Sequence, residues 1–396
     1  MTLTPADLVE VEAVEQLEAG AARGALRHPH MPAVMLTDAS EARAHWEVFE
    51  YVERADGTEP IRQHVYSSVA TEYRRHEGGW VAKSRRPTRL RVDDGARLFP
   101  DRRPPTRLTD GWLSDAALPA GEQLTDLEAI KQLKARYFRY LDTKNWARWR
   151  EVFADDATFN VAPVVSGQVG GEAFVDLVSR DMAGSITVHH GHAPEIRFLD
   201  SDRAVGIWML GDYVEFPAAI QGGTLSGIRG YGHYEERYRK EQNGWKIAEL
   251  RLSYLRIDPL VRPPIVQPHD LECVSDGWLP PGGLPAGEQL VDLHEIKLIT
   301  HAHFRRLDTE QTSGGTTSLH HLHMPEVRFP ERDRARGIWA LFDLVERRDG
   351  GAARYGHLEA EYVRTDGVWT IAQLRRRPLR DDPLPAGWPI EAAPRH

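Results

Sequence analysis

An internal repeat that occurs three times is the feature that most constrains how this 396-residue chain can fold. The segment HHGHAPEIRFLDSDRAVGIWMLGDYVE, from His189, matches HHLHMPEVRFPERDRARGIWALFDLVE, from His320. It also matches, more weakly, HPHMPAVMLTDASEARAHWEVFEYVE, from His28. A repeat of this kind indicates that each copy is one structural unit that packs against its neighbours. A second matching block begins at Gly230, Arg354 and Val65.

Only the middle copy carries a full set of segments. Its leading helix, in LPAGEQLTDLEAIKQLKARYFRYLDT from Leu118, is echoed by LPAGEQLVDLHEIKLITHAHFRRLDT from Leu284. The middle copy then holds a second helix, a strand at Ala157–Val161 and a third helix at Glu172–Arg180, where the third copy has only the short connector Glu310–Thr317. We therefore expect both flanking copies to keep the sheet, and only the middle copy to enclose a pocket.

Four long β-like segments follow the helices of the middle copy, and turn residues separate them. Consecutive strands joined by tight turns predict an antiparallel meander. Because the helices precede the strands, the fold class is α+β, a cone-shaped curved antiparallel sheet with helices packed on its concave face. The four segments are Thr187–Leu199, Arg203–Phe216, Arg229–Glu241 and Trp245–Ile257.

The repeats divide the chain into domains and linkers. Three copies in one chain suggest an intrachain pseudo-trimer, with the full chain a monomer or a dimer. The predicted divisions are a truncated copy at 1–96, a linker at 97–120, a complete domain at 121–259, a Pro-rich linker at 260–286, a truncated copy at 287–384 and a tail at 385–396.

Composition excludes several classes of partner. A net charge of −9 disfavours binding of polyanions, so the basic cluster Arg85, Arg86, Arg89 and Arg91 is interpreted as a solvated strand end and no nucleic-acid partner is expected. No apolar run reaches membrane-spanning length, and the acidic first residues are unlike a targeting peptide. The single cysteine, Cys273, fits a reducing compartment. We expect a cytoplasmic protein with no membrane partner.

Asp142 and His189 are the candidate acid–base pair. Asp142 lies one turn after Phe138, so its side chain emerges from the apolar side of the leading helix. A buried carboxylate bonded to an imidazole fixes the imidazole tautomer and raises its basicity, so that the second ring nitrogen can remove a proton. The alternative is structural, with Asp142 ending its helix and His189 a satisfied core histidine.

The order helix–helix–strand–helix–sheet resembles the nuclear transport factor-like superfamily, in its SnoaL-like and scytalone dehydratase-like branch with a cystatin-like cone. The motifs that carry the resemblance are RYLDTKNWARWREVFADDATF from Arg139, TVHHGHAPEI from Thr187 and GHYEERYRKEQNGWKI from Gly232. The resemblance covers the middle copy from end to end and each flank in part. This superfamily includes dehydratases, isomerases, cyclases, dioxygenase small subunits and non-catalytic binders.

The resemblance implies roles for particular residues. The dehydratase aspartate and histidine fall on Asp142 and His189. Tyr137 coincides with a tyrosine of related bile-acid dehydratases and is the third predicted catalytic residue, expected to donate a hydrogen bond to the developing enolate oxygen. Two family tyrosines are replaced here, by Leu141 and Val161, so the proton relay differs from the family pattern. The predicted substrate-binding side chains are Tyr234, Phe138, Trp146, Trp208, Tyr213 and His190.

His-x-His pairs recur in all three copies, and such a pair on a strand is a known arrangement of metal ligands. Because the pairs also occur in the truncated copies, we interpret them as serving packing or contact between copies, and no metal is expected. Tyr231 and His233 are likewise predicted to face a neighbouring copy.

The sequence thus predicts a cofactor-independent lyase or isomerase, of dehydratase or cyclase type, acting on a small apolar oxygenated metabolite in secondary metabolism. A non-catalytic small-molecule-binding or scaffold protein of the same fold is the alternative. The small subunit of a ring-hydroxylating oxygenase is disfavoured, because such a subunit needs no triplication.

Overall fold

A computed structural model describes most of the chain. The described residues are 3–22, 26–30, 32–56, 59–77, 79–94, 109, 111–161, 165–167, 170–220, 225–261, 278–280, 283–309, 317–347 and 350–384. Cys273, residues 310–316 of the predicted connector Glu310–Thr317, and the predicted tail at 385–396 lie outside them, as does most of both predicted linkers. None of the described helices is long and apolar enough to cross a membrane.

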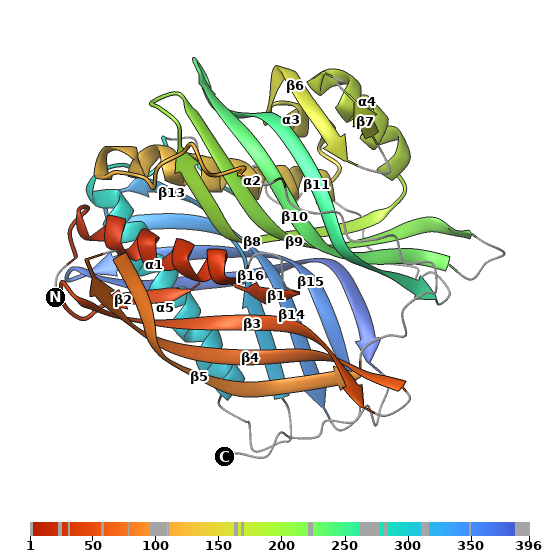
Figure 1. The fold of residues 1–396 in the computed structure, drawn as a ribbon, viewed down its shortest axis with the longest axis horizontal. Helices are drawn as coiled ribbons and strands as arrows, with labels where there is room; N and C mark the ends of the chain where they lie inside the picture. Colours follow the sequence, from red (N-terminus) through yellow and green to blue (C-terminus); the bar gives the residue numbers. More distant parts are fainter. Residues whose placement is uncertain are drawn as a thin grey trace.

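The middle copy contains four helical segments and six strands (Figure 1). The sheet has the order β7-β6-β11-β10-β9-β8. One pairing departs from the predicted antiparallel sheet, since β6 runs parallel to β11 and so extends the sheet beyond the meander. The elements are η1 (Gly121–Gln123), α2 (Leu124–Asp142), α3 (Trp146–Arg150), β6 (Phe153–Val161), β7 (Val165–Gly167), α4 (Gly171–Met182), β8 (Ile186–Phe198), β9 (Arg203–Ile220), β10 (Leu225–Glu241) and β11 (Gly244–Val261).

In its described residues, each flanking copy keeps one helix and a five-stranded antiparallel sheet, as the repeat predicted. In both, the strand that corresponds to β8 is split into two short pieces, β1 and β2 or β12 and β13. The first copy has α1 (Asp7–Ala22), β1 (Arg27–Pro29), β2 (Ala33–Leu36), β3 (Glu41–Asp56), β4 (Glu59–His76) and β5 (Gly79–Asp94). The third copy has α5 (Glu288–Thr309), β12 (Thr317–Leu322), β13 (Glu326–Glu331), β14 (Arg334–Arg347), β15 (Gly350–Thr365) and β16 (Val368–Leu384).

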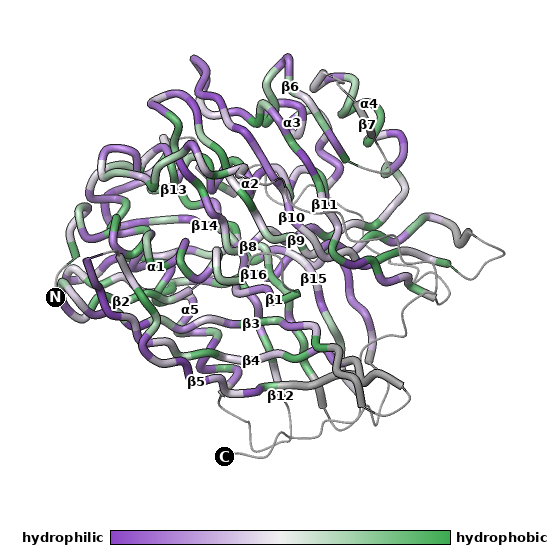
Figure 2. Tube along the Cα trace, viewed as in Figure 1, coloured by the Kyte–Doolittle hydropathy of each residue, from purple (hydrophilic) through white to green (hydrophobic). Residues whose placement is uncertain are grey.

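A tryptophan–tyrosine hydrogen bond recurs in the core of every copy. The indole Nε1 donates to the tyrosine hydroxyl at 3.1 Å for Trp46 and Tyr73, 2.7 Å for Trp208 and Tyr238, and 2.8 Å for Trp339 and Tyr362. All six side chains are buried, so each bond satisfies polar atoms that have left water. The repeated bond shows that the three copies share the same core contact between two neighbouring strands. Hydrophobic segments accordingly occur in all three sheets (Figure 2).

The copies form a closed ring in which the leading helix of each packs on the next copy. Helix α1 packs on β8, α2 packs on β13, and α5 packs on β2. Gln16 donates from Nε2 to the carbonyl of Ile196 at 2.8 Å, and His294 Nε2 lies 3.1 Å from the carbonyl oxygen of Val34. Head-to-tail contacts that close in this way give cyclic symmetry. The chain is therefore arranged as a pseudo-trimer.

Aromatic side chains fill the contact between the sheets. Tyr231 of the middle copy stacks on Phe49 of the first copy, with ring centroids 5.5 Å apart. Tyr66 of the first copy stacks on Phe342 of the third at 6.4 Å. Tyr231 therefore faces a neighbouring copy, as its position on the strand predicted.

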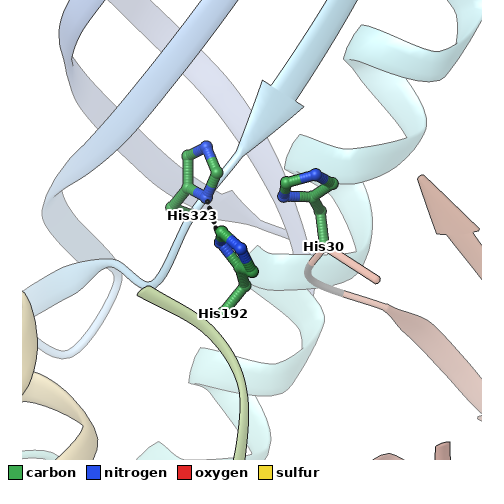
Figure 3. Close-up of side chains that lie close together, drawn as sticks. All are labelled: His30, His192 and His323. Atoms are coloured by element: carbon green, nitrogen blue, oxygen red, sulfur yellow. Dashed lines mark hydrogen bonds between the residues drawn. The ribbon is translucent and has the colours of Figure 1, made fainter. Parts of the chain in front are cut away.

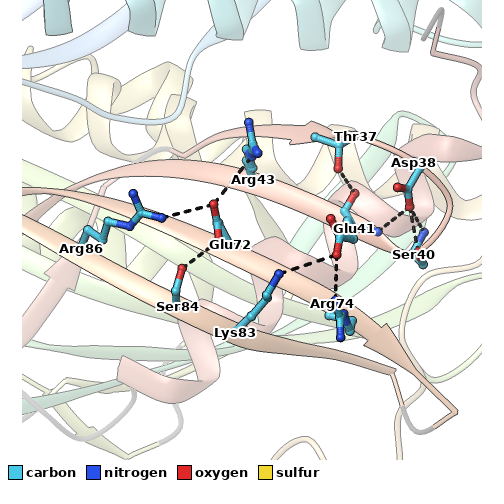
Figure 4. Close-up of polar contacts among 10 residues, drawn as sticks. All are labelled: Thr37, Asp38, Ser40, Glu41, Arg43, Glu72, Arg74, Lys83, Ser84 and Arg86. Atoms are coloured by element: carbon cyan, nitrogen blue, oxygen red, sulfur yellow. Dashed lines mark hydrogen bonds and ion pairs between the residues drawn. The ribbon is translucent and has the colours of Figure 1, made fainter.

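The outer face of the first sheet carries basic and acidic side chains together (Figure 4). Arg86 lies 3.5 Å from Glu72, and Arg74 and Lys83 lie 3.1 and 3.8 Å from Glu41. Arg85 reaches inward and bonds to the buried Glu18 at 2.6 Å. Of the basic cluster noted in the sequence, Arg86 thus pairs with a carboxylate on this face and Arg85 pairs with a buried one.

Candidate active site

Asp142 is the last residue of α2, and its buried carboxylate is held by the start of β8. Oδ1 lies 2.6 Å from Nδ1 of His189 and accepts a hydrogen bond from the Thr187 hydroxyl at 2.9 Å. Oδ2 accepts from the backbone N–H of His189 at 2.8 Å. These contacts fix both the carboxylate and the imidazole, so the structure brings the predicted acid–base pair together.

Lys144 adds a positive charge beside this pair, which sequence reasoning missed. Its backbone has a φ of 59°, a left-handed conformation that is uncommon for a non-glycine residue. Its ammonium donates to the Thr187 hydroxyl at 2.6 Å. Burial lowers the pKa of Lys144 to about 8, and the opposing charge of Asp142 limits the decrease. Its only sequence signal is its position two residues after the aspartate.

The third copy repeats the pair almost atom for atom. Asp308 Oδ1 lies 2.5 Å from Nδ1 of His320, and Oδ2 accepts from the His320 backbone N–H at 3.0 Å. The second ring nitrogen of His320 is occupied, because Asp343 lies 3.5 Å from it and Arg376 lies 3.4 Å from it. Arg376 also pairs with Asp343 at 2.7 Å. This histidine has no free nitrogen for proton transfer.

The middle copy leaves the second nitrogen of His189 open. Asp212 occupies the position of Asp343, opposite the histidine in the sheet, but it accepts a hydrogen bond from the Tyr254 hydroxyl at 2.6 Å. Burial raises the pKa of Asp212. Among the described residues, Nε2 of His189 has no hydrogen-bond partner. Of the two pairs, only the middle one leaves a histidine nitrogen without a partner among the described residues.

A cavity of about 20 Å³ adjoins His189 and extends toward the third copy. Phe138 and Gly191 line it on the side of the middle copy, and His323, Met324 and other third-copy residues line it on the far side. A second cavity, of about 10 Å³, adjoins His320. We expected a pocket in the middle copy alone, whereas both cavities lie between copies. The larger holds about one water molecule.

Aromatic rings and one ammonium group occupy the cone interior next to the pair. Lys134 Nζ lies 3.5 Å from the ring centroid of Tyr234 and 3.9 Å from that of Tyr137, and it bonds to Glu236 at 2.5 Å. Burial raises the pKa of Tyr137, which a hydrogen bond with Tyr234 partly offsets. Tyr137 and Tyr234 therefore contact each other and Lys134, and neither lines the cavity.

The other predicted substrate-binding residues lie in different surroundings. The Phe138 ring stacks on His189 at 6.3 Å and lines the cavity. Trp146 packs on Trp149 at 5.9 Å, and Trp208 belongs to the repeated core hydrogen bond. The remaining two, Tyr213 and His190, lie at the interface with the third copy, 5.6 Å from Tyr355 and 3.8 Å from His323.

The His-x-His pairs meet where the three copies converge. We call His30, His192 and His323 the inner histidines and His28, His190 and His321 the outer histidines. Each outer ring packs on an inner ring of the next copy, with centroids 4.8 Å apart for His28 and His192, 3.8 Å for His190 and His323, and 4.0 Å for His321 and His30. The predicted contact between copies is thus present, and the inner histidines are a set that could hold a metal ion (Figure 3).

Solved structures that the chain resembles include a hexachlorocyclohexane dehydrochlorinase, LinA-type3, from Novosphingobium barchaimii LL02, at 21% identity over 37% of this chain and 98% of its own, with a TM-score of 0.32. The Kfla4162 protein of Kribbella flavida is 21% identical over 34% of this chain and 94% of its own, with a TM-score of 0.32. An NTF2-like protein with a cystatin-like fold from Novosphingobium aromaticivorans is 18% identical over 34% and 84%, with a TM-score of 0.28.

The family match is more extensive and follows the repeat. The SnoaL-like domain matches residues 122–251 of the middle copy and residues 288–375 of the third copy, which together make more than half of the chain. The chain belongs to the SnoaL-like domain family.

Proposed function

We propose that this chain is a cofactor-independent lyase or isomerase, of the dehydratase or cyclase type, whose working site is the middle pair. The substrate is a small, mainly apolar, oxygenated metabolite, such as a polyketide- or terpenoid-like compound of secondary metabolism. The observation that carries the proposal is the arrangement of His189, whose Nδ1 contacts Asp142 while its Nε2 has no partner among the described residues. The matching histidine of the third copy has both nitrogens occupied.

The proposal gives each residue a role. Asp142 accepts a hydrogen bond from Nδ1–H of His189, so the lone pair is on Nε2, and Nε2 acts as the general base. The base removes a proton next to a substrate carbonyl and returns it to a departing hydroxyl or to a shifted double bond. Tyr137 acts as a positioning residue, because its hydroxyl is hydrogen-bonded to Tyr234 and its ring contacts the Lys134 ammonium.

Substrate binding requires a change at Phe138. The cavity beside His189 is about 20 Å³, which fits one water molecule, and the Phe138 ring stacks on the imidazole. Movement of this ring away from Gly191 would open space next to Nε2, which makes Phe138 the side chain that selects substrate size.

Exchange of substrate protons for deuterium tests the proposal without knowledge of the leaving group. A panel of small ketones and β-hydroxy ketones is incubated with the protein in D2O, and loss of the α-proton signal is followed by NMR. We expect His189→Gln and Asp142→Asn to lower the exchange rate by ~10²–10⁴-fold, the usual contribution of a general base. Asp308→Asn in the third copy is the matched control and should leave the rate unchanged. Equal losses in the Asp142 and Asp308 variants would contradict the proposal.

A scaffold or ligand-binding function is the second candidate, and the filled cone favours it. The same pair survives in the third copy, where the second nitrogen of His320 is occupied, so the pair also serves to fix a helix end to a strand. In that case Asp142→Asn and Asp308→Asn should destabilise the protein by similar amounts, and no member of the panel should exchange.

A further inference from the structure

The inner histidines are brought together by the ring of copies rather than by any single copy. His30 follows β1, His192 lies in β8, and His323 follows β12. Their candidate ligand nitrogens all lie within 4.8 Å of one another, and the side chains point toward a common centre (Figure 3). All three residues are at least nine-tenths buried.

The spacing of two of these rings matches that of ligands around a small cation. Nδ1 of His192 lies 3.4 Å from Nδ1 of His323. In a tetrahedral zinc site with Zn–N bonds of ~2.0–2.1 Å, neighbouring nitrogens are about 3.4 Å apart. Zinc binding therefore requires only that the longer distances between ligand nitrogens, which are at most 4.8 Å, become shorter.

The buried rings also lack the polar partners that interior groups normally have. Neither nitrogen of His30, nor Nε2 of His323, has a hydrogen-bond partner among the described residues. Buried polar groups in folded proteins are almost always paired.

An outer histidine orients one inner ring in the manner of a supporting residue at a metal site. Nδ1 of His28 lies 2.9 Å from Nε2 of His192. If that contact is Nε2–H donating to His28, the Nδ1 lone pair of His192 points at His323 and the cluster centre. Metal-ligating histidines commonly have their second nitrogen held in this way.

We propose that the inner histidines bind one divalent first-row ion, with zinc as the best fit, and that this ion joins the three copies. Three neutral imidazoles suit Zn²⁺ better than the oxygen-preferring Mg²⁺ or Ca²⁺. His323 lines the cavity of about 20 Å³ and His30 lines the cavity of about 10 Å³, each near the size of one water. A water molecule completes the coordination. The ion takes no part in the acid–base reaction and instead closes the ring.

The test measures zinc binding by the full, tag-free chain. The protein is stripped with a chelator, titrated with ZnCl₂ against a competing indicator dye, and its bound zinc is counted by mass spectrometry. We expect one zinc per chain, and an upward shift in the thermal midpoint that grows with zinc concentration. Less than one tenth of a zinc per chain would overturn the proposal.

Three variants distinguish the cluster from the other buried histidines. His192→Gln removes an inner ligand and should weaken zinc binding more than His28→Gln, for which a loss of ~10–100-fold is expected of a supporting residue. His294→Gln is the matched control, since His294 is buried between copies but contacts a carbonyl oxygen outside the cluster. Equal effects in all three variants would overturn the assignment.

Cobalt gives a readout that does not depend on a variant. If His192→Gln does not fold, the wild-type chain loaded with Co²⁺ decides the question. Intense visible bands of a four-coordinate nitrogen site support the proposal, and the weak spectrum of hydrated Co²⁺ refutes it.

Discussion

Replacement of the buried Lys134–Glu236 pair should separate the cost of burying charge from the gain of pairing it. Lys134 and Glu236 are fully buried, 2.5 Å apart, and Glu236 also accepts a hydrogen bond from Tyr238. Burial lowers the pKa of Lys134 to about 8 from 10.5, although its partner opposes the decrease. The third copy has Thr300 and Ala360 at the equivalent positions, so the fold can form this site without either charge.

The expected magnitudes follow from that burial. Lys134→Met alone leaves the Glu236 carboxylate buried without its counter-ion, which typically costs ~3–5 kcal/mol. Lys134→Met with Glu236→Gln removes both charges and keeps an acceptor for the Tyr238 hydroxyl. We expect the double variant to recover at least half of the loss, since apolar replacements of buried pairs are often neutral or stabilising.

The pH dependence provides a second, independent measure. Between pH 8 and about 10.4 the unfolded chain holds a proton on Lys134 that the folded chain has released, so wild-type stability rises with pH in this window. The slope is about 1.4 kcal/mol per pH unit and the total about 3 kcal/mol. Below pH 8 the wild type carries the full free-energy cost of burying the protonated Lys134. Neither variant contains Lys134, so neither shows this pH-dependent contribution to stability.

Urea unfolding of the wild type and both variants, at pH 7 and at steps from pH 8 to 10, measures these differences. The difference in unfolding free energy between the wild type and the double variant cancels the contributions of the titrating groups that both proteins contain. A flat difference over this window, or a single variant as stable as the double variant, would refute the reasoning.

Three further predictions concern the site and the ring. Gly191→Ala should destabilise the protein by ~1–3 kcal/mol in thermal or urea unfolding, because its Cβ would lie 2.3 Å from the Phe138 ring, and Phe138→Leu should relieve the loss. Arg139→Met should cost ~3–5 kcal/mol by the same assay, since it leaves Glu326 of the third copy buried without its 2.7 Å partner, and an unchanged midpoint would argue against this contact. In the wild type, the deuterium-exchange rate should change near pH 8, where the Lys144 ammonium loses its proton. Lys144→Met should abolish this change.

Much of the fold could be read from the sequence because the copies constrain one another. The repeat placed the leading helix of the middle copy within LPAGEQLTDLEAIKQLKARYFRYLDT, from Leu118, and the structure has α2 at Leu124–Asp142. The family resemblance placed an aspartate at the end of the leading helix and a histidine on the first long strand, and the structure brings Asp142 and His189 into contact. The parallel pairing of β6 with β11 was not predicted, because no local signal records which edge a distant strand joins.

The surroundings of the pair were harder to predict, for reasons specific to each residue. Adjacent strand residues point to opposite faces, so His189 in the cone places His190 at the interface between copies. By the same alternation, Tyr213, which follows Asp212 on its strand, lies at the interface with the third copy. Lys144 reaches the site through a left-handed backbone turn for which the sequence has no glycine signal.

The closed ring of copies also sets an order of events during synthesis. Helix α5, which packs on β2, begins roughly 250 residues after that strand ends. At the usual translation rate of ~5–20 residues per second, α5 is synthesised about 10–50 s after β2. The first copy must therefore either remain folded with one face uncovered or delay folding until the last copy has been made.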